Sequence, residues 1–126
     1  MNLLKEYSKN LIHRDIKPAN LLIGNDDPYI IYLIGYGLYK KYRNNRTGKH
    51  VKFSIRKYYN GTSTFASLNA FKAIEVSRRD DFESAAYTLI YSMQGFLPWD
   101  SVKVKTKYER FKKIFDKNYA KICQKK

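Results

Sequence analysis

A chain of 126 residues can form one domain with a buried core, and its 44% hydrophobic content excludes a disordered composition. The formal net charge of +14 favours phosphate, nucleic acid, acidic protein or an anionic membrane as a partner, without choosing among them. The single cysteine excludes an intrachain disulfide. No signal-peptide core or bilayer-length apolar run occurs, so we expect a cytosolic or nuclear protein.

The first half of the chain predicts a helix end, a hairpin and a loop. Residues 1–11 have mixed apolar spacing, as at the end of a helix. Two short apolar runs, 21–23 and 29–34, predict strands, and "GNDDP" at 24–28 has the composition of a turn. Residues 38–69 are polar and basic, which predicts a long irregular loop.

The second half predicts two helices. Over 80–95, apolar residues recur at helical spacing and predict a buried stripe. The stripe consists of Phe82, Ala85, Ala86, Leu89, Ile90 and Met93. Asp80 or Asp81 is the expected N-cap, and Gly95 is the expected end. Residues 107–115 predict a second, more exposed helix.

The string "HRDIKPAN", residues 13–20, holds the clearest chemistry. Asp15 could accept a proton from a hydroxyl, and Lys17 could neutralise a phosphoryl oxygen. Asn20 could offer an oxygen to a hard cation. An isolated Asp–Lys pair is usually a surface ion pair, but the whole string, followed by a hairpin and the Gly-Tyr-Gly at 35–37, is far more specific.

This string resembles the catalytic loop of protein kinases, and the chain looks like the large lobe of casein kinase I. The closer resemblance is carried by "KKYRNNRT", "GTSTFASLNA", "IEVSRRDDFES" and "LPW", over about residues 8–115. It implies an α+β fold, a protein-kinase-like C-terminal (large) lobe that is mainly helical with a small β-hairpin. Residues 1–126 would be a partial Ser/Thr protein kinase domain, whose family uses ATP and Mg²⁺.

The resemblance also implies roles for single residues near the substrate. Asp15 would be the base that orients the substrate hydroxyl, and Lys17 would touch the transferring phosphoryl group. Asn20 would hold a magnesium ion. Thr62 would hydrogen-bond near Asp15 and Lys17 and belong to the substrate-binding loop.

Three further residues would be structural by the same resemblance. His13 and Arg14 would support the loop, and Asp81 would hold it from below. Taken alone, His13 is better explained as a satisfied packing histidine. A simple N-cap fits Asp81 equally well.

Two departures predict that the chain alone is inactive. Gly35 stands where the metal-binding aspartate of Asp-Phe-Gly belongs, and glycine has no side-chain ligand. Asp26 and Asp27 lie at the far end of the predicted hairpin and are poor substitutes. The small (N-terminal) lobe is expected to be absent, because Met1 stands only 12 residues before His13 and no G-x-G-x-x-G occurs.

A third departure concerns substrate choice. Casein kinase I prefers sites near acidic or phosphorylated residues and has a basic pocket for them. Lys57 and Lys103 match two basic positions of that pocket, but Thr64 replaces the third, an arginine. The resemblance therefore implies an acidic or phosphorylated protein partner and a weakened pocket. Solvated surface charge is the simpler explanation of each lysine.

Three hypotheses remain open from the sequence. The first is a casein-kinase-I-like enzyme, and the second is a pseudokinase or scaffold that binds a protein without turnover, which Gly35 favours. The third is a basic module that binds nucleic acid through charge, with a steep salt dependence. The kinase-like order of motifs makes this third hypothesis the least favoured, and no membrane partner is expected.

Overall fold

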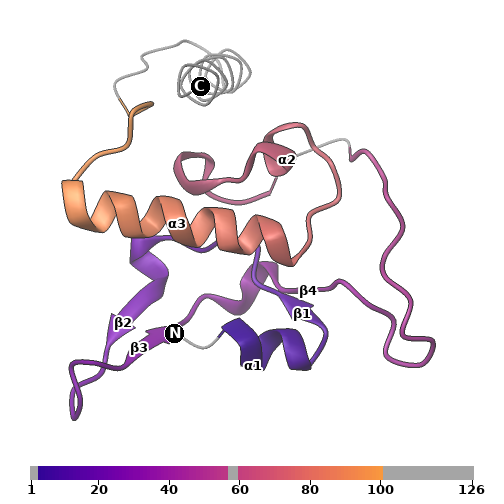
Figure 1. Ribbon diagram of the computed structural model, residues 1–126, viewed down its shortest axis with the longest axis horizontal. Helices are drawn as coiled ribbons and strands as arrows, with labels where there is room; N and C mark the ends of the chain where they lie inside the picture. The colour runs from indigo at the N-terminus through magenta and orange to yellow at the C-terminus, as the bar shows by residue number, and fades with distance from the viewer. Residues whose placement is uncertain (1–2, 57–59, 101–126) are drawn as a thin grey trace, which may run out of the picture.

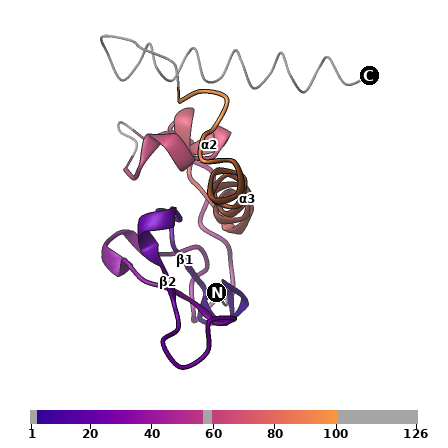
Figure 2. The same cartoon turned by 90° about the vertical axis from the view of Figure 1, so that its left-hand side faces the viewer.

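The computed structural model describes residues 3–56 and 60–100, which form a mixed α/β arrangement (Figure 1). The elements in chain order are α1 (Leu3–Ser8), β1 (Leu11–Ile12), the 3₁₀ helix η1 (Pro18–Asn20), β2 (Leu21–Ile23), β3 (Ile31–Leu33), η2 (Tyr36–Leu38), β4 (Lys40–Lys41), η3 (Ser63–Phe65), α2 (Leu68–Phe71) and α3 (Arg78–Gln94). The long helix α3 lies between α2 on one side and the strands on the other (Figure 2). The predicted helix end over 1–11 corresponds to α1.

The predicted hairpin is confirmed, with a second strand shorter than the predicted 29–34. β2 and β3 pair antiparallel, and Leu21 lies opposite Leu33. At the open end of the hairpin the backbone N–H of Ile34 donates to the carbonyl of Asn20, 2.9 Å away. The hairpin therefore begins directly at the end of the catalytic-loop motif.

One strand of a second small sheet lies inside the region predicted as a loop. β1 and β4 pair antiparallel, with Ile12 opposite Lys40. The prediction of irregular structure throughout 38–69 is therefore wrong at both ends, because β4, η3 and the start of α2 lie there. Between them the Asn44 side chain accepts two backbone hydrogen bonds from the following turn. Two-residue strands are too short for an alternating pattern to predict.

Helix α3 begins one residue after Ser77, which is its N-cap. The Asp80 carboxylate accepts a hydrogen bond of 2.7 Å from the Ser77 backbone N–H, as in a capping box. The prediction that Asp80 or Asp81 caps the helix is therefore wrong. Gly95 ends the helix as predicted, with a φ of 76° that a residue without Cβ adopts at little cost.

The buried face of α3 differs from the predicted stripe. Its buried side chains are Asp80, Asp81, Ala85 and Thr88. The stripe members that are exposed are Phe82, Ala86, Leu89, Ile90 and Met93. The buried-stripe prediction is thus wrong except at Ala85. Helical spacing identifies residues that share a face, but a polar face can still be the buried one when its groups find hydrogen-bond partners.

The described residues bury their apolar side chains in two clusters. One consists of Tyr7, Ile12, Ile16, Tyr42 and Ala85. The other consists of Phe65, Leu97 and Trp99, and it is fastened by the Trp99 indole N–H, which donates to the Thr64 carbonyl at 2.8 Å. The first cluster lies under the catalytic-loop motif, because Ile12 and Ile16 flank its first residues.

Several predictions fall on other parts of the chain. The helix predicted over 107–115, Lys57 and Lys103 lie outside the described residues. Within 3–56 and 60–100, no helix combines the length and apolar character required to span a bilayer.

Candidate active site

Asp81 fixes the backbone of the catalytic-loop motif. Its side chain is on the first turn of α3, in a residue only 2% exposed. The carboxylate accepts hydrogen bonds from the backbone N–H of His13, at 2.7 Å, and of Arg14, at 2.8 Å. Burial raises the pKa of Asp81, and these two bonds offset that rise only in part. The carboxylate therefore supports the loop and does not cap its own helix.

His13 is a buried residue with both ring nitrogens engaged. Nε2 lies 2.9 Å from the carbonyl of Ile34, and Nδ1 accepts a hydrogen bond from the backbone N–H of Asp15 at 3.2 Å. The neutral tautomer with its proton on Nε2 satisfies both contacts. Tyr39 packs edge-on against the ring. His13 thus ties the start of the loop to the end of the hairpin.

Asp15, Lys17 and Thr62 form one hydrogen-bonded group. Lys17 Nζ lies 2.8 Å from Asp15 Oδ2 and donates to Thr62 Oγ1, also at 2.8 Å. The Thr62 backbone N–H donates to Asp15 Oδ1 at 2.9 Å. Burial raises the pKa of Asp15, but the hydrogen bonds from Lys17 and Thr62 outweigh it and hold the pKa below its ordinary value of 3.8. Asp15 is therefore a carboxylate at neutral pH.

Asn20 faces Asp15 on one side and Gly35 on the other. Its side-chain amide donates to the backbone carbonyl of Asp15 at 2.8 Å and approaches Oδ2 at 3.3 Å. Gly35 has a φ of 87°, and a Cβ built there would lie 2.7 Å from Asn20 Oδ1. The Asn20 side chain therefore fills the space that a side chain at position 35 would need.

Residues 4–126 match the family model described as the protein kinase domain. This chain belongs to the protein kinase domain family. The match covers the catalytic-loop motif, the hairpin and α3. Kinases of this family generally use ATP with Mg²⁺, which two groups hold: the aspartate of Asp-Phe-Gly and the catalytic-loop asparagine.

Among the described residues, the positions where the family holds magnesium do not supply the ligands that the ion prefers. Gly35 supplies no ligand, and Asn20 has one neutral oxygen to offer. Both carboxylate oxygens of Asp15 are occupied by Lys17 and Thr62. Among the residues that the structure describes, no group of three or more His, Cys, Asp or Glu could hold a metal ion.

The hairpin aspartates do not replace the missing ligand. Asp26 and Asp27 are exposed in the turn that joins β2 to β3, at the opposite end of the hairpin from Asn20 and Gly35. Asp27 is occupied locally, because its carboxylate accepts the backbone N–H of Tyr29 at 2.9 Å. The prediction that they are poor substitutes agrees with this placement.

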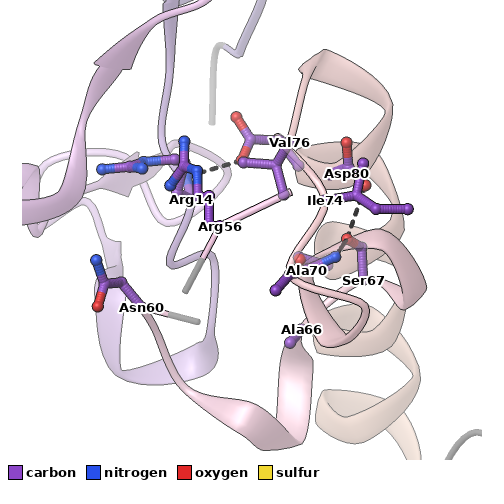
Figure 3. Close-up of a pocket in the computed structure, with 12 residues that line it drawn as sticks. Arg14, Arg56, Asn60, Ala66, Ser67, Ala70, Ile74, Val76 and Asp80 are labelled. Atoms are coloured by element: carbon purple, nitrogen blue, oxygen red, sulfur yellow. Dashed lines mark hydrogen bonds between the residues drawn. The ribbon is translucent and has the colours of Figure 1, made fainter. Parts of the chain in front are cut away.

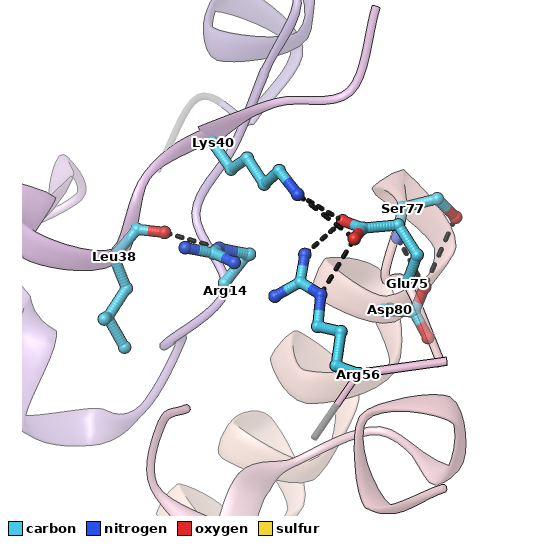
Figure 4. Close-up of polar contacts among 7 residues, drawn as sticks. All are labelled: Arg14, Leu38, Lys40, Arg56, Glu75, Ser77 and Asp80. Atoms are coloured by element: carbon cyan, nitrogen blue, oxygen red, sulfur yellow. Dashed lines mark hydrogen bonds and ion pairs between the residues drawn. The ribbon is translucent and has the colours of Figure 1, made fainter. Parts of the chain in front are cut away.

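Sequence reasoning missed a cluster of charges beside the loop. Arg14, whose φ of 70° is left-handed, donates from Nε to the Leu38 carbonyl at 2.5 Å. Close by, Lys40 and Arg56 both reach the carboxylate of Glu75 (Figure 4). Burial and the charge of Arg56 lower the pKa of Arg14. A single glutamate in "AIEVS" has no pattern that would predict this cluster.

A pocket opens between this cluster and α2. Arg14, Arg56 and Asn60 line one side, and Ser67 and Val76 are among the residues of the other (Figure 3). Its walls come from the catalytic loop, the chain before and after 57–59, and the segment leading into α3. Asp80 and Asp81 also line this pocket, so its lining holds two arginines and two aspartates.

Two of the three positions predicted for substrate choice are not covered by the structure. Lys57 and Lys103 lie outside the described residues. Thr64 lies in η3, where its carbonyl accepts the Trp99 indole N–H. It brings no charge to the position where the resemblance expects an arginine.

Proposed function

We propose that this kinase domain is a casein-kinase-I-like Ser/Thr kinase domain that retains the substrate half of its site. We infer further that these 126 residues alone do not transfer phosphate. The observation that carries the proposal is Lys17 Nζ, which bridges the Asp15 carboxylate and the Thr62 hydroxyl at 2.8 Å each. A proton acceptor, a cation and a residue of the substrate loop thus lie in one group.

The chemistry of this group suits a hydroxyl substrate. The lowered pKa keeps Asp15 ionised at neutral pH, so its carboxylate can orient a Ser or Thr hydroxyl and accept its proton. Lys17 can neutralise charge that develops on a phosphoryl oxygen. The backbone N–H of Thr62 bonds the Asp15 carboxylate, and under this proposal a peptide bound along the Thr62 segment would lie beside the acceptor.

The subfamily and the partner are inferred from sequence strings. "KKYRNNRT" and "IEVSRRDDFES" are particular to casein kinase I, and that family favours acidic or phosphorylated protein sites. A net charge of +14 suits such a partner. Lys57 and Lys103 are the proposed contacts, and Thr64 is the position where binding is weakened. We also propose a cytosolic or nuclear location.

The metal side of the site supports the proposed inactivity. Position 35 has no carboxylate, and Asn20 occupies the space of the missing side chain. Phosphoryl transfer needs both metal-holding groups to neutralise charge between the β- and γ-phosphates. We therefore derive no transfer step for the isolated chain.

A pseudokinase or scaffold is the second candidate, and the Asn20–Gly35 contact favours it. The substrate half is held by its own hydrogen bonds and needs no metal. Under this alternative, Asp15, Lys17 and Thr62 bind a protein segment without turnover.

Two measurements on the 126-residue chain test the proposal. In the first, isothermal titration calorimetry with ATP is run with and without Mg²⁺, alongside transfer from [γ-³²P]ATP to casein. We expect neither Mg²⁺-dependent binding nor turnover, and robust turnover would refute the inactivity. Asp15→Asn is the control, because genuine turnover would disappear in that variant.

The second measurement tests the partner. Fluorescence anisotropy compares a Ser peptide with acidic flanks, its neutral counterpart and a single-stranded RNA. We expect the acidic peptide to bind most tightly and Lys17→Met to weaken it. RNA binding that exceeds peptide binding and falls steeply with salt would instead support the nucleic-acid hypothesis.

A further inference from the structure

Glu75 joins separate segments of the chain beside the candidate site (Figure 4). Its side chain is 8% exposed, and Lys40 Nζ lies 3.0 and 3.1 Å from its two oxygens. Arg56 Nε lies 2.8 Å from Oε2, and Arg56 Nη2 bonds Oε1. Within the described residues, neither cation pairs with any other carboxylate. One nearly buried carboxylate therefore balances two cations from different segments.

The backbone around Glu75 follows the same arrangement. The Glu75 N–H donates to the Ser54 carbonyl at 2.9 Å, and the Arg56 N–H donates to the Ala73 carbonyl at 2.7 Å. These bonds lay residues 54–56 against 73–75. The ion pair between Arg56 and Glu75 adds a side-chain contact between the same two segments.

Both segments lead to the catalytic loop. Lys40 stands two residues after Leu38, whose carbonyl accepts the Nε–H of Arg14. Arg56 stands six residues before Thr62, which contacts Asp15. Glu75 itself stands two residues before Ser77, the N-cap of the helix that carries Asp81. A change at Glu75 would therefore affect three segments that contact the catalytic loop, those that contain Lys40, Arg56 and Glu75 itself.

We propose that Glu75 is a positioning residue, a built-in anion that holds 36–41 and 54–56 beside the catalytic loop. In many kinases a phosphorylated side chain orders such segments by pairing with arginine and lysine. A carboxylate offers Arg56 the same two-pronged hydrogen bonding that a phosphate group offers. The segment then keeps its position without an added phosphate. This deepens the proposed function, since it states how that site is held.

The ionisation of Glu75 is consistent with a permanent anion. Burial raises its pKa, but the hydrogen bonds and charges of Arg56 and Lys40 outweigh burial and lower it. Removing the charge would leave Lys40 and Arg56 facing each other without compensation in a partly buried place. An anion from solution would then be attracted to them. This consequence distinguishes a built-in anion from a residue that only packs.

The test is limited trypsin digestion of the 126-residue chain and its Glu75→Gln variant. The variant changes no Lys or Arg, so the cleavage sites are the same. We expect cleavage after Lys49 and Lys52 to become about tenfold faster, the factor that corresponds to about 1.4 kcal/mol. Inorganic phosphate should slow it again, whereas chloride at equal ionic strength should not. Wild type should show no phosphate effect.

Glu83→Gln is the matched control. Glu83 accepts hydrogen bonds from the Leu68 N–H and the Tyr87 hydroxyl, and pairs with no cation among the described residues. Its loss should speed cleavage without any phosphate dependence. Unchanged cleavage in Glu75→Gln, or faster cleavage that phosphate does not reverse, would overturn the proposal. Neither readout involves phosphoryl transfer, so failure here leaves the proposed function intact.

A second variant covers the case in which Glu75→Gln does not fold by circular dichroism. Arg56→Gln removes one cation and keeps the pair of Lys40 with Glu75. Cleavage after Lys52 should speed up, and phosphate should give no protection because the carboxylate remains. Cleavage at the wild-type rate, or protection by phosphate, would contradict a built-in anion.

Discussion

The two halves of the candidate site are held in different ways. On the substrate side, Asp15, Lys17 and Thr62 bond one another across more than 40 residues of sequence. On the metal side, the Asn20 side chain bonds Asp15 and fills the space next to Gly35. The comparison teaches that a network of charged and polar partners is self-supporting. The metal side has fewer such contacts, and there the Asn20 side chain fills the space that a side chain at position 35 would need.

We expect the largest effect from removing Asp81, which holds the loop that both halves of the site share. Asp81→Ala would leave the buried backbone N–H of His13 and the partly buried N–H of Arg14 without this partner. We expect the free energy of unfolding to fall by about 3 kcal/mol, measured by urea denaturation. Asp27→Ala, at an exposed turn, should change it by only about 0.5 kcal/mol. Equal losses in the two variants would show that the loop does not depend on Asp81.

The next substitution tests whether the Asn20 side chain leaves no room for a side chain at position 35. Gly35→Asp should lower the free energy of unfolding by about 2 kcal/mol, because φ is 87° and the new Cβ would meet Asn20. Adding Asn20→Ala should recover about 1 kcal/mol of this loss in a double-mutant cycle.

Gly37→Ala is the control for position 35. A Cβ there meets nothing within 4 Å, so the change should cost well below the value at Gly35. Mg²⁺ titration of Gly35→Asp by calorimetry should remain flat. Tight Mg²⁺ binding by this single variant would break the comparison, since one carboxylate would then have restored the metal side.

We expect a smaller effect from a substitution that tests the charged groups on the substrate side. Lys17→Met should raise the pKa of Asp15 towards its ordinary value, as read from carboxyl ¹³C shifts in a pH titration. The Lys17 side chain is 25% exposed, so the expected stability loss is only about 0.5–1 kcal/mol.

The pH dependence of this variant follows from the sign of the shift. In the wild type the folded pKa of Asp15 lies below the unfolded value, so the unfolded state binds more protons between the two. The stabilisation is present above the ordinary pKa of 3.8 and disappears as pH falls through the folded value. Lys17→Met should therefore lose less stability on acidification than the wild type. Identical acid profiles would mean that Lys17 does not set the pKa.

The two halves also differ in what the sequence could predict. The motif at 13–20 placed Asp15, Lys17 and Asn20 on one loop, because their order and spacing are specific. Thr62 required the resemblance, since nothing in its own neighbourhood points to residues more than 40 positions away. The hairpin could be predicted from its two apolar runs and the turn between them.

Three features could not be predicted, each for a physical reason. Glu75 acts through partners 19 and 35 residues away, and a single glutamate has no period. β1 and β4 have two residues each, below the length at which alternation is visible. Ser77 was missed as the N-cap because the aspartates that follow it have the same preference for that position. Local sequence patterns thus predicted helices and strands. The arrangement of the candidate site depends on polar contacts between residues that are far apart in the sequence.

The smallest expected effect is a substitution on the exposed face of α3. We compare it with a substitution on the buried face of the same helix. Met93 is 85% exposed, so Met93→Gln should change the free energy of unfolding by less than about 0.5 kcal/mol. Ala85 is 7% exposed against Ile16 and Tyr42, and Ala85→Gln should cost about 2 kcal/mol because the larger polar side chain has no room. Urea denaturation of both variants gives the two values. If Met93→Gln were the more damaging of the two, the apolar stripe would be a buried face after all. The polar face that carries Asp81 would then not be what holds the catalytic loop.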